Sequence, residues 1–193
     1  DIRYRATAAT IRFLTALPER IIQLLDENNI LLAGQCFNIG SKVRSSLIQD
    51  TCASGILVMV PILQSKLVNL EDLRTNIIAS AKGALQSADL SAIDAATALL
   101  TISSMKNEAD FDFLEEFVNC RVKGLARLLK EAHVDSDELE GLGRNIRNSI
   151  KLFDNLFLHG TSSPLFKSQT TSFAELIGAK TELWPRFLPK EVY

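Results

Sequence analysis

The sequence predicts an all-α fold without a β-sheet: an elongated, stacked helical bundle in which helical hairpins form a rod. Leucine and alanine are far more frequent than valine, and aromatic residues make up only 7% of the chain, a composition that favours helices over strands. Nine glycines and five prolines among 193 residues leave long stretches without a helix breaker. Apolar residues recur every three or four positions, which is the period of an amphipathic helix.

The first helix is predicted over residues 1–17. Its apolar stripe is formed by Ile2, Ala6, Ala9, Phe13 and Ala16. Spacings of four and three residues are typical of a coiled-coil seam, so we interpret residues 1–17 as the end of a truncated, coiled-coil-like helix. Pro18 fits the first turn of a second helix, which predicts a helix boundary between residues 17 and 18.

Residues 18–160 are predicted to form the helical bundle. After the polar residues 26–29, which favour a turn, a helical pattern covers residues 30–48. The regular part of the following helix is expected to begin near Pro61, because proline is tolerated in a first turn but kinks a helix interior.

Capping residues indicate where three later helices begin. Ser91 followed by Asp94 resembles a capping box, and Asp110 or Asp112 can cap the next helix. The apolar face of that helix is predicted at Phe113, Leu114, Phe117, Val118, Arg121, Leu125, Leu128 and Leu129. Asp135 opens a further helix. Its stripe is predicted at Leu139, Leu142, Ile146, Ile150, Phe153 and Phe157.

The end of the chain differs in composition. Residues 161–171 are rich in Thr and Ser and are predicted to be a loop. Residues 172–193 are predicted to form a short helix and an extended tail with two prolines. We interpret Trp184 in this tail as a packing anchor, with a partner contact as the alternative, because tryptophan is enriched at interfaces.

Charge and cysteine content exclude several classes of protein. The net charge of −2 provides no bulk basic field for nucleic acid, so no nucleic-acid partner is expected. The longest uncharged run, residues 51–65, is shorter than the roughly twenty residues of a membrane span. Three widely spaced cysteines are interpreted as buried thiols. The one basic cluster consists of Arg3, Arg5 and Arg12. We interpret it as a solvated helix face, and contact with a membrane surface is the alternative.

Acidic residues offer one candidate for catalysis. Asp110, Asp112, Glu115 and Glu116 resemble the aspartate-rich helices of prenyl-transfer enzymes, but no second acidic cluster is evident to face them. His133 and His159 have no ligand at metal-binding spacing. We therefore predict no catalytic, cofactor-binding or metal-binding residue and no cofactor, and we keep a helical metal-dependent enzyme as the alternative.

Several ordered blocks resemble a known family. They are the Leu-Pro-Glu-x-Ile junction at 17–21, the small-residue helix at 24–43, the block at 61–77, the Ala-rich and Phe-Leu blocks at 95–121, and the Trp-x-x-x-Leu-Pro ending at 184–189. Their order and spacing are similar to the first-subunit family of the conserved oligomeric Golgi (COG) complex. That complex is one of the multisubunit tethers (CATCHR), and the related Vps51 subunit of an endosome-to-Golgi tether is the alternative.

This resemblance implies a structural subunit and no enzyme. Such subunits lie peripherally on the cytosolic face of Golgi membranes and act in vesicle tethering during retrograde intra-Golgi transport. The implied partners are sister subunits and, through the complex, Rab GTPases, SNAREs and coiled-coil tethers. Under this hypothesis the partner-binding residues are Ile2, Ala6, Ala9, Phe13 and Trp184. A regulatory domain for a GTPase is a further alternative.

Overall fold

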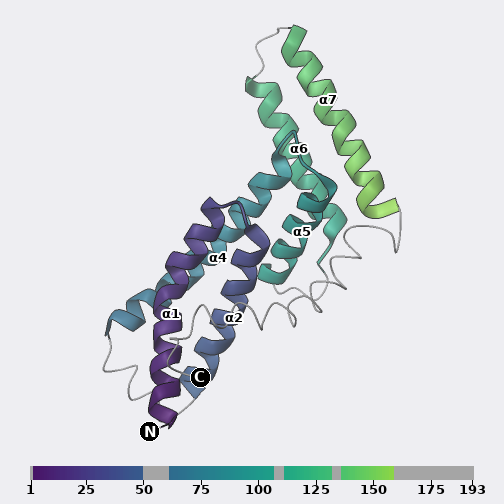
Figure 1. Ribbon diagram of the computed structural model, residues 1–193. Coiled ribbons are helices and arrows are strands. Elements are labelled where there is room, and N and C mark those ends of the chain that lie inside the picture. The colour runs from purple at the N-terminus through teal and green to yellow at the C-terminus, as the bar shows by residue number, and fades with distance from the viewer. Residues whose placement is uncertain (1, 50–60, 107–110, 132–135, 159–193) are drawn as a thin grey trace. The chain divides into compact units, whose positions relative to one another are not determined.

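The computed structural model describes residues 2–49, 61–106, 111–131 and 136–158, and every regular element among them is a helix (Figure 1). The elements are α1 (Ile2–Asp26), α2 (Ile30–Gln49), α4 (Pro61–Gln86), α5 (Ala92–Lys106), α6 (Phe113–Glu131), α7 (Ser136–Phe153) and the π-helical turn η1 (Asp154–Leu158). The predicted all-α helical bundle is therefore confirmed.

Contacts divide the chain into two compact units, and the boundary between them falls within α4. Unit 1 contains the described residues up to Ile77, and unit 2 contains those from Ile78 to Leu158. The bundle predicted for residues 18–160 thus spans parts of both units. The predicted loop at 161–171 and the predicted helix and tail at 172–193 lie outside the described residues.

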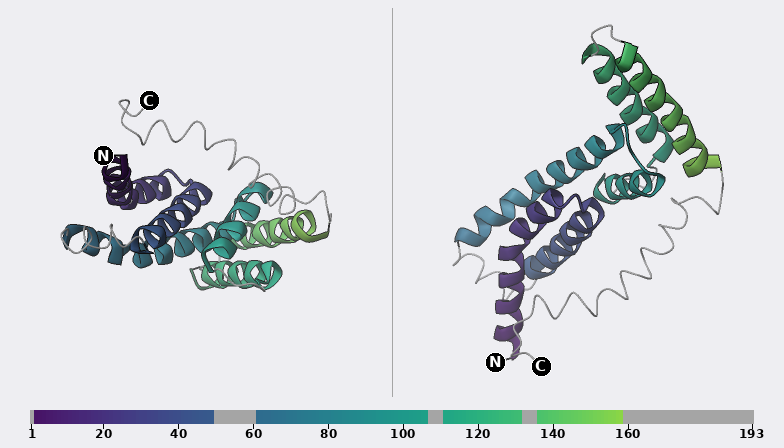
Figure 2. Two further views of the ribbon diagram at one scale, coloured as in Figure 1. Left: turned by 90° about the horizontal axis from the view of Figure 1, so that it is seen from below. Right: turned by 45° about the horizontal axis from the view of Figure 1, so that its top comes forward.

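Unit 1 is built on an antiparallel hairpin of α1 and α2, which lie side by side in Figures 1 and 2. The side chains that α1 buries are Leu14, Leu17, Ile21 and Leu24, and those of α2 include Ala33 and Phe37. Asn28 closes the turn between the helices with a φ of 57°, a conformation that asparagine tolerates better than most residues. The backbone N–H of Asn29 donates to the carbonyl of Leu24 at 2.8 Å.

The helix boundary predicted before Pro18 is wrong, because α1 runs without interruption from Ile2 to Asp26 with Pro18 inside it. An interior proline costs a helix about 3 kcal/mol, since it lacks an N–H and crowds the preceding turn. Leu17 and Ile21, on either side of it, are 3% and 0% exposed. Burial of such side chains contributes roughly 1.5–3 kcal/mol each, so packing against α2 offsets the defect.

Unit 2 is organised around α5, whose alanine-rich face is buried. The buried residues are Ala95, Ala96, Ala98, Leu99, Thr101, Ile102 and Met105. α5 contacts α6 and η1, and α6 forms an antiparallel hairpin with α7 (Figures 1 and 2). The rings of Phe117 on α6 and Phe157 on η1 pack 5.7 Å apart, so the π-helical turn helps to close this core.

The predicted starts of several helices are confirmed. α4 begins at Pro61. The Ser91 hydroxyl accepts a hydrogen bond from the Asp94 N–H at 3.1 Å and donates to the Asp94 carboxylate at 2.6 Å. Asp112 Oδ1 accepts from the N–H groups of Leu114 and Glu115 at 2.9 and 3.0 Å. Each of these caps satisfies backbone donors that the first turn leaves without a partner.

The predicted faces of α6 and α7 are partly wrong. Phe117 and Arg121 of the α6 stripe are buried, but Leu114, Val118 and Leu129 are exposed. On α7, Ile146 and Ile150 are exposed. The residues that α7 and η1 bury instead are Asn145, Leu152 and Leu156. The inward face of α7 is therefore turned by one residue from the face that apolar periodicity predicts.

We predict opposite effects for the same substitution at two glycines of unit 2. A Cβ at Gly124 would lie 2.8 Å from the carbonyl oxygen of Gln86, whereas a Cβ at exposed Gly83 would meet nothing within 4 Å. Gly124→Ala should lower the free energy of unfolding by roughly 1–3 kcal/mol because α6 must shift. Gly83→Ala should raise it by about 0.5–1 kcal/mol through lower backbone entropy of the unfolded chain.

Urea denaturation of the two variants beside the unchanged chain measures both effects. Equal stabilisation by the two alanines would contradict a close approach of α6 to the end of α4.

Candidate functional site

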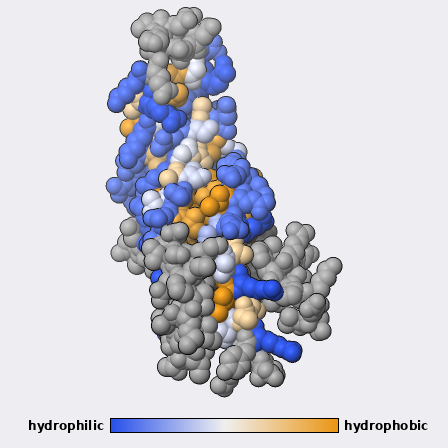
Figure 3. Space-filling view, turned by 90° about the vertical axis from the view of Figure 1, so that its left-hand side faces the viewer, coloured by the Kyte–Doolittle hydropathy of each residue, from blue (hydrophilic) through white to orange (hydrophobic). Residues whose placement is uncertain are grey.

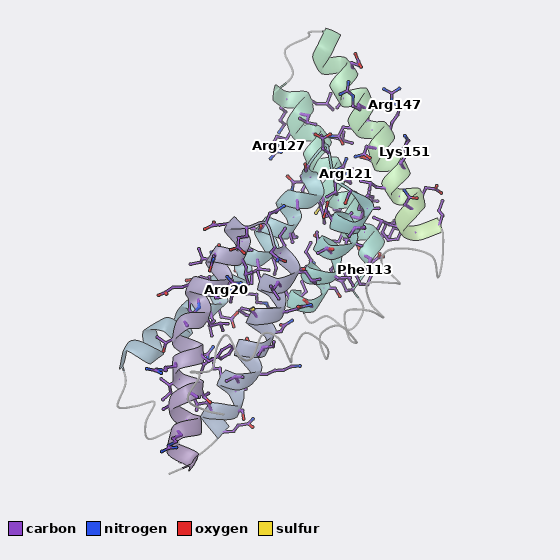
Figure 4. All side chains as sticks on the ribbon, viewed as in Figure 1. Arg20, Phe113, Arg121, Arg127, Arg147 and Lys151 are labelled. Atoms are coloured by element: carbon purple, nitrogen blue, oxygen red, sulfur yellow. The ribbon has the colours of Figure 1, made fainter. Side chains whose placement is uncertain are left out.

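A buried guanidinium joins three helical segments of unit 2. Arg121 on α6 is only 4% exposed, and Figure 4 shows it where α6 faces α7. Its Nη1 donates to the carbonyls of Leu85 at 3.0 Å and Ser87 at 2.5 Å. Its Nη2 donates to Asn145 Oδ1, and its Nε donates to Ser149 Oγ at 2.9 Å. Four hydrogen bonds therefore use most of the five N–H donors of the planar guanidinium.

The charge of Arg121 is compensated by backbone dipoles. Among the described residues, no carboxylate forms an ion pair with it. The carbonyls of Leu85 and Ser87 lie at the C-terminal end of α4, where carbonyls lack helical partners and the helix dipole is negative. Burial lowers the pKa of Arg121, but an arginine side chain keeps its proton in proteins. Arg121 thus acts as a cationic cap of α4.

Polar side chains of α7 complete this junction. The hydroxyl of Ser149 accepts from Arg121 and donates to the Asn145 carbonyl at 2.8 Å. The amide of Asn148 donates to the carbonyls of Ala88 and Leu90, at 2.8 and 3.4 Å. α7 is therefore bound both to Arg121 and to the segment between α4 and α5.

A second charged cluster holds α6 in place. Glu116 forms ion pairs with Lys82 of α4 at 2.8 Å and with Lys106 of α5 at 2.9 Å. Burial raises the pKa of Glu116, but hydrogen bonds and charge from both lysines lower it by more, so the net shift is downward. Beside it, burial and the Glu116 charge raise the pKa of the Cys120 thiol, which keeps that buried cysteine protonated.

The acidic residues considered for metal chemistry have separate structural roles. Asp112 caps α6, Glu116 pairs with two lysines, and Glu115 is exposed. Asp110 lies outside the described residues. Within the described part of the chain, no group of three or more His, Cys, Asp or Glu side chains is arranged to hold a metal ion. The side chains of Asp112, Glu115 and Glu116 therefore do not come together as ligands of a single metal ion.

An apolar stripe on α6 faces solvent in unit 2. We call it the apolar face of α6; it consists of Leu114, Val118, Val122 and Leu129, which are 40–57% exposed. Their spacings of four, four and seven residues place them on one side of a helix. Figure 3 shows hydrophobic side chains at the surface among hydrophilic ones. Such a stripe is typical of a helix that docks against another helix.

The predicted partner-binding residues are only partly described. Ile2 and Ala6 lie in α1, but their side chains fall outside the description. Ala9 and Phe13 are half-buried on the same helix. Trp184 lies outside the described residues. Leu114, Val118 and Leu129 were predicted on the inward face of α6, but they are exposed. Arg121, the one charged residue within that predicted stripe, was the signal in the sequence for the buried polar junction.

No family model, no curated protein and no solved structure matches the chain. None of the helices among the described residues combines the length and the apolar character needed to cross a membrane.

Replacing Arg121 with lysine tests the junction. An ammonium group cannot present a planar fork to four acceptors on three segments, so Arg121→Lys should lower the free energy of unfolding by roughly 2–4 kcal/mol. Arg127→Lys is the matched control, because Arg127 lies on the exposed side of the same helix and should change stability by less than about 0.5 kcal/mol. Equal effects in chemical denaturation would contradict a buried fork.

The Glu116 cluster predicts a pH dependence. Because the folded pKa of Glu116 lies below its ordinary value of 4.5, the unfolded chain binds the proton first as pH falls. The stabilisation by Glu116 is present above pH 4.5 and should be lost as pH drops through the lowered folded pKa.

Glu116→Gln should therefore reduce stability at neutral pH and flatten the fall of stability on acidification. Glu115→Gln, on the exposed side of the same turn, should leave that profile unchanged. Denaturation curves collected from neutral to acidic pH make the comparison, and parallel profiles for the two variants would refute the ion-pair cluster.

Proposed function

We propose that this chain is a structural subunit of a vesicle-tethering complex, in the position of the first subunit of the conserved oligomeric Golgi complex. It organises sister subunits through helix–helix contacts on the cytosolic face of Golgi membranes, in retrograde intra-Golgi transport. Support comes from the ordered sequence blocks between residues 17 and 189 and from the all-helical architecture, which suits a rigid scaffold.

The apolar face of α6 is the observation that carries this proposal. A soluble helix normally buries its apolar stripe, yet this stripe remains solvent-accessible beside a buried polar junction. Covering one half-exposed valine or leucine would contribute roughly 1 kcal/mol. Four such side chains along α6 would contribute roughly 4 kcal/mol, which favours one register of a partner helix that also makes contacts elsewhere.

Identifying the proteins that co-purify with the full chain from cells tests the proposal. We expect sister subunits of the Golgi tether, whereas recovery of the endosome-to-Golgi tether would assign the chain to the Vps51 type instead. Recovery of a Rab GTPase alone, in one nucleotide state, would favour a GTPase regulatory domain. Recovery of none of these would contradict tether membership.

A variant of the apolar face links the function to the surface. Val118→Asn combined with Val122→Asn should reduce recovery of sister subunits roughly tenfold, because two apolar contacts are lost. The control variant, Lys123→Asn with Arg127→Asn, changes exposed polar residues on the other side of α6 and should leave recovery unchanged. An unchanged yield with the valine variant would place the subunit contacts elsewhere.

A further inference from the structure

Unit 2 contains a groove between α7 and the segment that joins α4 to α5. Its volume is about 640 Å³. The residues that line it are Ala88, Asp89, Leu90 and Ser91 on one side and Arg144, Arg147, Asn148 and Lys151 on the other. The Asn148 amide binds the Ala88 and Leu90 carbonyls across it, so the two walls are held at a fixed separation.

The charge of the groove is positive. Arg144, Arg147 and Lys151 face a single carboxylate, that of Asp89, although the whole chain carries a net charge of −2. Arg144 is partly compensated by Glu140 on its own helix, at 3.1 Å. Arg147 and Lys151 are exposed and form no ion pair within the described part of the chain. Two cations are thus available to a ligand.

The spacing of the cations indicates the shape of that ligand. Residues 144, 147 and 151 follow one another at three and four positions, so they form one edge of α7 that is about 10 Å long. Figure 4 shows Arg147 and Lys151 along α7. A single phosphate would meet only one part of this row. Carboxylates on one face of a partner helix, at the same spacing of three and four residues, would match it along its length.

We infer that this groove binds an acidic helical segment of a partner protein, with Arg147 and Lys151 as the principal contacts. Asp89, at the opposite wall, disfavours a ligand that is negative on all sides and favours one whose carboxylates face α7. None of the lining residues belongs to the apolar face of α6. The two surfaces are therefore independent, and the groove stands even if the proposed tethering role fails.

Fluorescence anisotropy with the full chain tests this inference. The probe is a labelled helical peptide with glutamates at positions i, i+3 and i+7, and the comparison peptide has glutamines there. We expect the glutamate peptide to bind, the glutamine peptide not to bind, and affinity to fall as ionic strength rises. Binding of both peptides alike would overturn the inference.

Matched double variants locate the site. Arg147→Gln with Lys151→Gln should weaken the glutamate peptide roughly tenfold, since two exposed charge contacts are lost. Lys123→Gln with Arg127→Gln removes the same charge from exposed positions on α6 and should leave affinity unchanged. Equal weakening by both variants would show a nonspecific charge effect and overturn the inference.

Two other ligands are tested as competitors of the glutamate peptide. One is phosphatidylserine in vesicles, and the other is inorganic phosphate in solution. We expect neither to displace the glutamate peptide at physiological ionic strength. If the groove variant instead loses vesicle binding while the peptide does not bind the unchanged chain, the groove recognises lipid and the inference is wrong. Thermal melting of each variant establishes that the exposed substitutions leave the fold intact.

Discussion

The requirement to satisfy one buried guanidinium constrains how α4, α6 and α7 meet in unit 2. Arg121 donates to two carbonyls at the end of α4 and to two side chains of α7. Leaving those groups without partners in the interior would cost several kcal/mol. The positions of three elements therefore depend on one another: the end of α4, α6 where it approaches α4 closely at Gly124, and α7.

This polar junction explains why apolar side chains lie at the surface. Arg121, Asn145 and Ser149 occupy inward positions that leucine or isoleucine would otherwise fill. α6 and α7 are consequently rotated, and the apolar face of α6 and the Ile146–Ile150 edge of α7 turn toward solvent. The same junction that fixes the unit thus creates the surface that we assign to partner helices.

The sequence predicts what is local and misses what depends on distant neighbours. The all-helical class follows from composition and period, and the helix starts at Pro61, Ser91 and Asp112 follow from local capping rules. The continuity of α1 through Pro18 depends on packing against α2. The inward face of α6 depends on acceptors more than thirty residues away, at Leu85 and Ser87, and periodicity carries no information about them.

Residues 145–151 of α7 divide the helix into three faces. The first face holds Asn145 and Ser149, which bind Arg121 at the junction. The second face is the exposed apolar edge with Ile146 and Ile150. The third face lines the groove with Arg147 and Lys151. Consecutive residues of a helix are turned by about 100°, so a four-residue spacing repeats each face one turn later. A helix arranged in this way can be held by its own unit while its apolar edge and its basic edge remain open to different partners at the same time. The scaffold role that we propose requires simultaneous contact with several proteins, and the order of three residue types along this helix provides separate faces for it.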